Sequence, residues 1–324
     1  MKRVLIVGGA NLDLTAVAPR LPGRGETVLA RAYRELPGGK AANVACAAAV
    51  WGADVSFVGR VGDDAFGDTL LAAWRDIGVD TAHVRRDPAG TGLGMVFMDA
   101  RGDYQTLVVP RANDRLDADD VATLPATLWD EVGVVALALE APVEAMVATA
   151  RAALNRRLPL VLNAAPAEGM VDDLWLCASH LVVNEHEAVQ LTGLDVGGPG
   201  DAMTAASALL ERMVAGRGEA VVVTLGARGA VLARTDEKAE HVAAPTVEAV
   251  DSLGAGDTFV GVLVAEVAAG CELRAAVEAA CRAGAAAVTV EGARAGVTRE
   301  RAQGVGNGAK RSLEDQTRRK GVEV

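Results

Sequence analysis

The stretch Asp251–Thr258, with the sequence DSLGAGDT, combines small residues with a carboxylate in a pattern that could do chemistry on phosphate. An apolar run at helical spacing follows it, so Gly254, Ala255 and Gly256 are expected to form a tight turn that opens a helix. Backbone N–H groups left uncovered at such a turn, together with the helix dipole, make an anion site. Asp257 would lie beside that site, in the first helical turn.

Two interpretations of Asp257 follow from these residues alone. A carboxylate next to an anion site suits proton removal from a hydroxyl group that attacks a bound phosphate. Alternatively, Asp257 is a first-turn acid that favours the helix dipole, and the glycines only make the turn. The octapeptide by itself leaves both interpretations open.

Composition narrows the class of protein. The chain has 324 residues, 51% of them apolar and only 3% aromatic, which permits one large α/β domain with an aliphatic core or two smaller domains. A net charge of -11 argues against nucleic acid as a partner. The four scattered cysteines form no CxxC pair, which fits a reducing cytoplasm. No signal peptide or membrane span is expected.

From residue 133 onward, short β-rich runs alternate with helical patterns, which predicts a mostly parallel, doubly wound sheet with helices on both faces. Ligands of such sheets bind beyond the carboxyl ends of the strands. Polar residues stand at five expected strand ends: Asn11, Glu140, Asn163, Asn184 and Thr224.

Two N-terminal groups are candidates for binding hydroxyl groups. Asn11 and Asp13 point to the same side of an extended segment and could fork onto vicinal hydroxyls, although an Asx turn is the simpler interpretation. Gly39 is expected to open a helix that carries Lys40 and Asn43 on one face. A solvated surface lysine is the alternative there, and the pattern is not a Walker A loop.

The second half holds candidates for nucleotide contacts. Asn184 and Glu187, three apart at a helix start, either cap that helix or hold a hydrated Mg²⁺ near phosphates. Thr224 ends a strand, and Gly226 and Gly229 after it would let a nucleotide approach the backbone.

Glu140 is either an acid at a helix N-terminus or a sugar ligand.

The domain organisation is expected to be one α/β domain over residues 1–300. Segments of about 14–36 and 91–109 contain β-rich pieces and a hairpin signal, and they could form a small separate sheet that acts as a lid. Residues 301–324 mix Gly, Lys, Arg, Glu and Gln, and are expected to be a mobile tail after a short helical start.

Taken together, these residues resemble the ribokinase family of carbohydrate kinases from about Arg3 to Thr298. The resemblance rests on GGKAAN at 38–43, GRVGDD at 59–64, NEHE at 184–187 and DSLGAGDTF at 251–259. It implies a ribokinase-like fold, Asp257 as catalytic base and residues 254–256 as the anion hole. The sugar contacts that it implies are Asn11, Asp13, Gly39, Lys40, Asn43, Glu140 and Asp257. The nucleotide contacts that it implies are Asn184, Thr224, Gly226, Gly229 and Gly256.

The resemblance also implies the reaction and its partners. ATP would phosphorylate a primary hydroxyl of a sugar, most simply turning D-ribose into ribose 5-phosphate, since Glu140 and Asn113 match the ribose-specific members of the family best. Mg²⁺ would be held through water by Glu187, and the chain would form a homodimer through its lid. A K⁺ site is implied at Asp251, Leu253, Ala287, Val290, Gly292 and Gly296.

Two departures from the family pattern stand out. Ala41 replaces a Gly that is common in the family. The segment around Val290 and Gly296 lacks the usual ending of the family, and Gly296 stands where the family often has Ser. The second departure weakens the expectation of a K⁺ site.

Three alternative functions remain. A kinase of another sugar or of a nucleoside would share the catalytic motif, although scarce aromatics favour a free sugar. A non-catalytic sugar sensor on the same fold would not need Asp257. A nicotinamide dehydrogenase lacks its complete glycine fingerprint.

Overall fold

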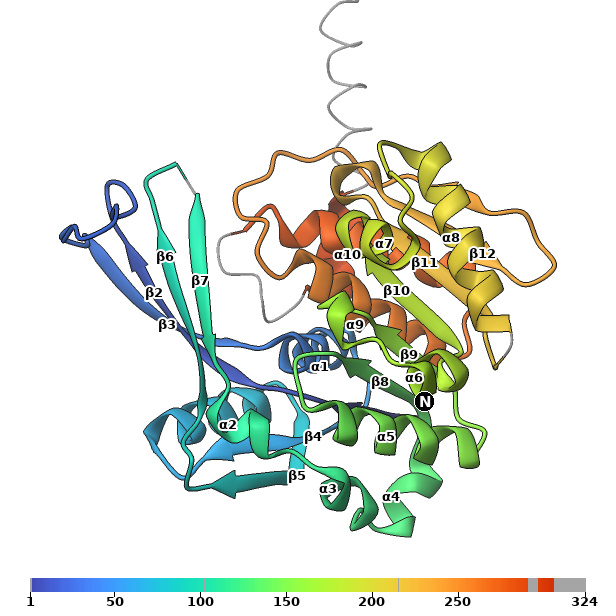
Figure 1. The fold of residues 1–324 in the computed structure, drawn as a ribbon, viewed down its shortest axis with the longest axis horizontal. Coiled ribbons are helices and arrows are strands. Elements are labelled where there is room, and N and C mark those ends of the chain that lie inside the picture. The colour runs from blue at the N-terminus through green and yellow to red at the C-terminus, as the bar shows by residue number, and fades with distance from the viewer. Residues whose placement is uncertain (1, 102, 215, 291–296, 306–324) are drawn as a thin grey trace, which may run out of the picture.

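The computed structural model describes residues 2–101, 103–214, 216–290 and 297–305, and two sheets organise this part of the chain (Figure 1). The larger has nine strands in the order β13-β12-β11-β10-β9-β8-β1-β4-β5, and the smaller has four in the order β3-β2-β6-β7. In the large sheet all neighbours from β11 to β5 run parallel, while β12 and β13 are antiparallel additions at one edge. The predicted doubly wound, mostly parallel sheet is confirmed.

The strands are β1 Arg3–Val7, β2 Asn11–Val17, β3 Ala32–Gly38, β4 Val55–Gly62, β5 Val79–Asp87, β6 Gly92–Met98, β7 Tyr104–Val109, β8 Val132–Ala138, β9 Leu160–Asn163, β10 His180–Asn184, β11 Ala220–Thr224, β12 Ala230–Arg234 and β13 Glu240–Val242. The α-helices are α1 Lys40–Trp51, α2 Ala65–Asp76, α3 Ala118–Ala122, α4 Ala126–Glu131, α5 Val143–Asn155, α6 Asp172–Cys177, α7 Glu185–Thr192, α8 Pro199–Val214, α9 Ala255–Ala268 and α10 Leu273–Ala287. Three 3₁₀ helices, η1 Arg111–Arg115, η2 Ala167–Gly169 and η3 Gly226–Arg228, complete the described elements.

Helices cover both faces of the large sheet because its strands are apolar on both sides. In β1, Val4 and Ile6 belong to a core shared with α1, α2, α9 and α10, whereas Leu5 and Val7 belong to a second core shared with α3, α5, α6 and α8. This near-continuous apolar sequence is typical of a parallel strand buried between two helical layers. Within the first layer, α9 packs between α1 and α10.

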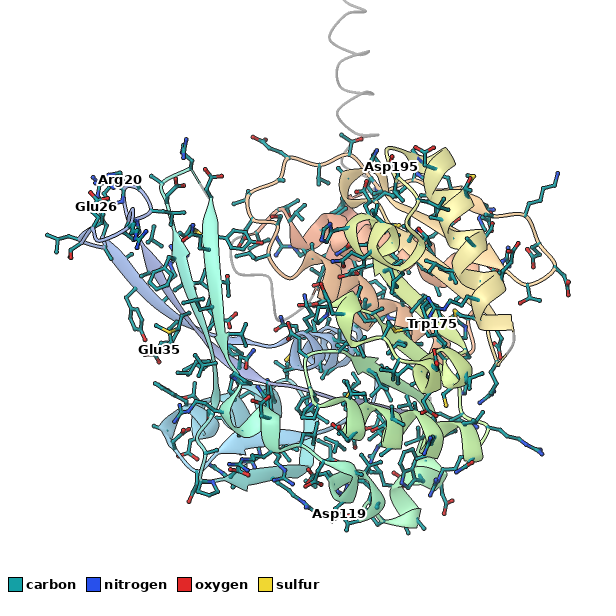
Figure 2. All side chains as sticks on the ribbon, viewed as in Figure 1. Arg20, Glu26, Glu35, Asp119, Trp175 and Asp195 are labelled. Atoms are coloured by element: carbon teal, nitrogen blue, oxygen red, sulfur yellow. The ribbon has the colours of Figure 1, made fainter. Side chains whose placement is uncertain are left out.

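The small sheet projects from the main body (Figure 1) and is built from segments 11–38 and 92–109. Strands β2 and β6 pair in parallel, and each carries an antiparallel partner, β3 and β7. Both predicted β-rich segments contain strands of this sheet, whereas residues 27–29 lie in the loop between β2 and β3. An ion pair between Arg20 and Glu26 closes this loop, with Arg20 Nη1 and Glu26 Oε2 2.6 Å apart (Figure 2).

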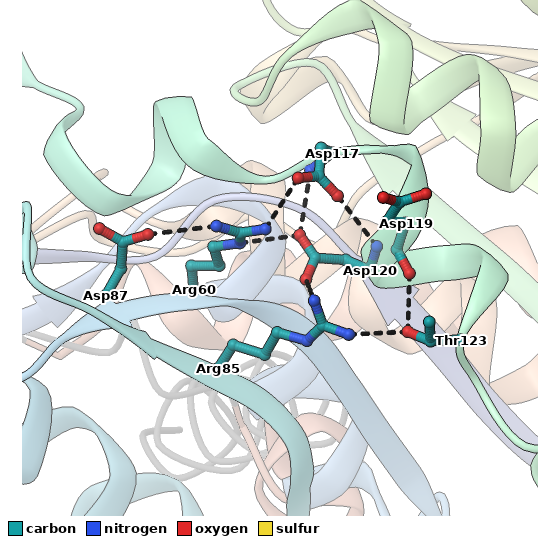
Figure 3. A network of polar contacts seen from close by, with 7 residues as sticks. All are labelled: Arg60, Arg85, Asp87, Asp117, Asp119, Asp120 and Thr123. Carbon is teal, nitrogen blue, oxygen red and sulfur yellow. Dashed lines mark hydrogen bonds and ion pairs between the residues drawn. The ribbon is translucent and has the colours of Figure 1, made fainter.

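The GRVGDD motif at 59–64 begins on a strand, because β4 continues to Gly62. Arg60 lies on that strand and bonds carboxylates of Asp87, Asp117 and Asp120 at 3.1, 2.9 and 2.8 Å (Figure 3). Asp120 also pairs with Arg85. The arginines therefore join β4 and β5 to α3, which fixes the chain just before it enters the small sheet.

Candidate active site

Asp257 lies in the first turn of α9, as predicted, and the start of this helix is open. Gly254 precedes it with a left-handed φ of 77°, a conformation that disfavours side chains, and no side chain caps the helix. A Cβ atom added to Gly256 would meet nothing within 4 Å. The start of α9 is thus open at Gly256, beside the first-turn Asp257, while the Ala255 N–H group donates to Ser252 O at 3.4 Å. A helix N-terminus of this kind can hold an anion.

Helix α1 brings two predicted residues to Asp257. The buried Asn43 donates from Nδ2 to Asp257 Oδ2 over 2.8 Å, although 214 positions separate the two residues. Lys40, one turn earlier and half-buried, experiences opposing effects on its pKa. Burial lowers the pKa, but the nearby carboxylates of Asp257, Glu140 and Glu187 outweigh burial, so the pKa is raised overall. Lys40 is therefore a cation at neutral pH, in the field of carboxylates from three other segments.

Glu140 follows β8 and reaches across to α1. Its Oε2 atom accepts a hydrogen bond of 2.8 Å from the backbone N–H of Lys40, the first residue of that helix. Gly39, the N-cap residue, has no side chain to do this. Glu140 therefore is an acid at a helix N-terminus, as one prediction had it, but the helix is α1 and not the α5 helix that follows it in sequence.

Asn11 and Asp13 lie on β2, on the same side, as the extended pattern predicted. Glycines make room for both. A Cβ atom on Gly94 would stand 2.1 Å from Asp13 Oδ1, and one on Gly38 would stand 2.4 Å from Asp13 Oδ2. Gly92 lies equally close to Asn11, at 2.4 Å from Oδ1. The Asx turn is excluded, because both residues are paired in the middle strands of the small sheet.

The glycines of β6 were not recognised as part of the site. The signal was present in Gly92 and Gly94, since glycine inside a strand pattern often marks close approach of another group. Asn113 was noticed only through the family resemblance. It is 3% exposed, and it donates from Nδ2 to Asn11 Oδ1 over 2.8 Å.

The candidate nucleotide residues follow β10 and β11, further along the same edge of the sheet. Asn184 and Glu187 form a reciprocal capping box at the start of α7, and burial raises the pKa of the Glu187 carboxyl group. Thr224 is the register partner of Asn184. Gly226 is exposed with open space around its Cα, whereas Gly229 is explained by packing, because a Cβ atom there would stand 2.1 Å from Val242 O.

Of the residues predicted for a monovalent cation, Gly292 and Gly296 lie outside the described residues. The others come from two neighbouring segments. The backbone N–H groups of Val250 and Asp251 both donate to Val288 O, at 2.7 and 3.1 Å, and Asp251 Oδ1 accepts from Leu253 N at 3.0 Å. The loop before α9 is therefore joined to the end of α10, where Ala287 lies.

No group of three His, Cys, Asp or Glu side chains suited to a metal ion occurs in the described part of the chain. The same part contains no helix long and apolar enough to cross a bilayer.

An open helix N-terminus beside a carboxylate, at the carboxyl edge of a doubly wound sheet, could bind a phosphate next to a proton acceptor, as phosphoryl transfer requires. The comparisons specify the class further, because the model of the family described as pfkB family carbohydrate kinase matches residues 1–300. The chain belongs to the pfkB family and is a carbohydrate kinase.

Its relatives within the family include ribokinases. The ribokinase of Haemophilus influenzae is 30% identical over 91% of this chain and 95% of its own length. The deoxyribokinase of Salmonella typhi is 30% identical over 80% of this chain and 83% of its own. The structure of Arabidopsis thaliana ribokinase complexed with ribose and ATP superposes with a TM-score of 0.83 and 28% identity, and it covers 94% of this chain and 98% of that one. The predicted ribokinase-like fold is confirmed.

Proposed function

We propose that the protein is an ATP-dependent ribokinase, which transfers the γ-phosphate of ATP to the 5-hydroxyl group of D-ribose. The observation that carries this proposal is the hydrogen bond from Asn43 to Asp257 at the open N-terminus of α9. The hydroxyl-binding set on β2 and the ribokinase relatives, one of them solved with ribose and ATP, favour ribose.

Each residue has a role in the proposed reaction. Asp257 removes the proton of the attacking hydroxyl, and Asn43 orients its carboxylate. Gly254, Ala255 and Gly256 present their amides to the γ-phosphate, whose charge increases in the transition state. The sugar contacts Asn11, Asp13, Gly39, Lys40, Asn43 and Glu140. A sensor would have no use for an aligned base at an anion site.

ATP is placed along the ends of β10 and β11. Asn184, Thr224, Gly226 and Gly229 are the proposed contacts, with Gly256 at the phosphate end. Mg²⁺ fits this site only when carried by the phosphates and water, because the described residues supply no cluster of ligands for it. Glu187, buried and acidic, would hold one of those waters. The ion would neutralise charge on the β- and γ-phosphates.

K⁺ is a further proposed requirement. Asp251, Leu253, Ala287, Val290, Gly292 and Gly296 would hold it, mostly through carbonyl oxygens, with Asp251 supplying the carboxylate. The hydrogen bonds from Val250 and Asp251 to Val288 support a paired loop of this kind. K⁺ should raise the initial rate over tetramethylammonium at constant ionic strength, and Gly296→Ser should strengthen the effect. A flat response would contradict the site.

The small sheet is proposed as a lid over the sugar and as the contact of a homodimer. The register places Val108 on the side of Asp13, whereas Met95 and Leu107 point to the opposite face. That opposite face is apolar and open, with Tyr33 59%, Met95 36% and Leu107 63% exposed. A second copy of the small sheet would cover it.

Light scattering at micromolar concentration tests the dimer. Leu107→Glu should yield monomers, because it places a charge inside the proposed contact. Leu176→Glu is the matched control, since Leu176 is similarly exposed at 48% but lies on α6 in the main body. A wild-type monomer would remove the dimer but not the lid.

One experiment tests the reaction itself. ADP release is measured with Mg-ATP and a panel of D-ribose, 2-deoxyribose, hexoses, sugar phosphates and adenosine. Ribose should give the highest kcat/KM, and 2-deoxyribose a lower one, because a missing hydroxyl leaves buried polar groups unpaired. A preference for 2-deoxyribose would match the deoxyribokinase relative instead. A preference for adenosine would overturn the sugar assignment.

The protein is proposed to act in the cytoplasm. All four cysteines are free thiols, which is the state expected in a reducing compartment. Fractionation of the source cells would test this location.

A further inference from the structure

A buried asparagine, Asn113, connects the main-chain atoms of one residue to a proposed sugar contact. Its Oδ1 atom accepts from Ala10 N at 2.9 Å, and its Nδ2 atom donates to Ala10 O at 3.0 Å. The second Nδ2 hydrogen is donated to Asn11 Oδ1 at 2.8 Å. Asn113 and Asn11 are only 3% and 5% exposed, so water has little access to replace these bonds.

The donor and acceptor atoms in this chain of hydrogen bonds can be assigned in only one way. A backbone N–H group can only donate and a backbone C=O group can only accept, so Ala10 fixes which way the Asn113 amide is turned. The Asn113 atom that faces Asn11 must therefore be its NH₂ group. Asn11 must in turn present its oxygen to Asn113, which directs the Asn11 NH₂ group away from Asn113.

Gly92 keeps the two asparagines close together. A Cβ atom at this position would stand 2.3 Å from Asn113 Nδ2 and 2.4 Å from Asn11 Oδ1, so any side chain would push the amides apart. Gly92 is also the register partner of Asn11 in the small sheet. The strand that pairs with β2 therefore leaves room for the bond that orients the Asn11 amide.

We propose that Asn113 is a positioning residue that fixes Asn11 as a hydrogen-bond donor toward the sugar. This inference rests on the proposed function. Asn11 then offers N–H groups to a hydroxyl oxygen, while Asp13, two residues further on the same side of β2, offers an acceptor. A vicinal diol satisfies this pair when one hydroxyl accepts from Asn11 and its neighbour donates to Asp13. With the Asn11 amide reversed, both protein groups would be acceptors.

A double-mutant cycle tests the proposal. Asn113→Ala, Asn11→Ala and the double variant are compared for binding of D-ribose by calorimetry and for steady-state kinetics, or with whichever sugar has the highest kcat/KM in the panel. Asn113→Ala should weaken sugar binding roughly tenfold or more, with kcat and the KM for Mg-ATP nearly unchanged. In the Asn11→Ala background the same substitution should have little further effect. Asn155→Ala, at an exposed asparagine ending α5, is the control.

A second variant does not disturb Ala10 and so decides the question if Asn113→Ala fails to fold. Asn11→Asp keeps an oxygen that accepts from Asn113 but presents an acceptor to the sugar in place of the NH₂ group. Sugar affinity should fall about as far as in Asn11→Ala. Wild-type affinity in Asn11→Asp would overturn the proposal, as would additive effects in the cycle. Inactivity of the wild-type protein toward ribose would instead overturn the proposed substrate.

Discussion

Asp257 and Asn43 meet because two helices begin at the same edge of the large sheet. Asp257 is the third residue of α9, and Asn43 is the fourth residue of α1. Both helices start after a glycine with positive φ, Gly254 at 77° and Gly39 at 90°, and neither glycine offers a capping side chain. An amide at the start of α1 therefore donates to the Glu140 carboxylate, and in the proposed reaction the start of α9 takes the phosphate.

Asp257→Asn tests the base directly. The substitution keeps the shape of the side chain but removes its ability to take a proton, so kcat should fall by roughly 10²–10⁴-fold while ATP still binds. Asp172→Asn is the matched control, because Asp172 is another first-turn aspartate, at the start of α6. If Asp257 only favoured a helix dipole, both variants would change stability slightly and neither would change turnover. Steady-state kinetics and nucleotide titration separate the two interpretations.

The individual residues of the site could be predicted from the sequence better than their contacts. The position of Asp257 in a first helical turn follows from DSLGAGDT and the apolar run after it. Its contact with Asn43, 214 positions away, is a property of how α1 and α9 pack, and no local pattern contains it. The octapeptide left the role of Asp257 open for this reason.

At the scale of elements, β6 combines two tasks. It pairs with β2 along its whole length, and its alternate residues Gly92 and Gly94 leave space for the side chains of Asn11 and Asp13. A strand normally avoids glycine in its interior, because the residue packs nothing and costs backbone entropy. The two glycines are explained by the polar groups on the neighbouring strand.

Gly94→Ala should displace the Asp13 carboxylate, since the new Cβ atom would lie 2.1 Å from Oδ1 in the present arrangement. Losing a hydrogen bond to a charged group corresponds to about 1.5–3 kcal/mol, so the KM for the sugar should rise roughly 10–100-fold. The KM for Mg-ATP should stay the same. Met95→Ala alters the next residue of β6, on the opposite face in the proposed dimer contact, and at matched oligomeric state it should not change the sugar KM. Equal effects of both substitutions would mean that β6 acts only through general stability.

The sequence predicted long apolar elements well and polar ones poorly. Strands β9 and β11 and helix α5 belong to the alternation predicted from residue 133 onward, because their composition is strongly apolar or periodic. Strand β5, with the sequence VDTAHVRRD, was missed. It lies at the edge of the large sheet, so only one side of its backbone is paired, and much of its surface is polar. The short helices α3, α4 and α6 were missed too, since five or six residues carry little periodicity.

At the scale of the whole molecule, the amino ends of the parallel strands hold a buried histidine. His180, 7% exposed, starts β10, and its Nδ1 atom is 2.8 Å from Ser179 Oγ. Burial lowers the pKa of His180, and the nearby Glu219 carboxylate opposes this only in part. The folded protein therefore takes up this proton at a lower pH than the unfolded chain does.

Stability should consequently fall as the pH drops below about 6.5, the ordinary histidine pKa, because the unfolded chain then binds more protons than the folded one. The contribution of His180 would reach about 1.4 kcal/mol for each pH unit below that value until the folded pKa is passed. Denaturant unfolding of wild type and His180→Asn between pH 7.5 and 5.5 measures it. His186→Asn removes an exposed histidine instead and is the control. Parallel pH profiles for wild type and His180→Asn would contradict the prediction.

The small sheet is attached to the main body by four chain crossings, at residues 8–10, at Gly39, at 88–91 and at Pro110. A flap made from one hairpin hangs on two neighbouring crossings and can swing about them. Here two hairpins are joined side by side through β2 and β6, so the four crossings hold the small sheet to the main body at four points. A protease cut in the loop between β2 and β3 would consequently give two fragments that stay associated. After the cut, β2 is still joined to the main body at residues 8–10, and β3 is still joined to it at Gly39.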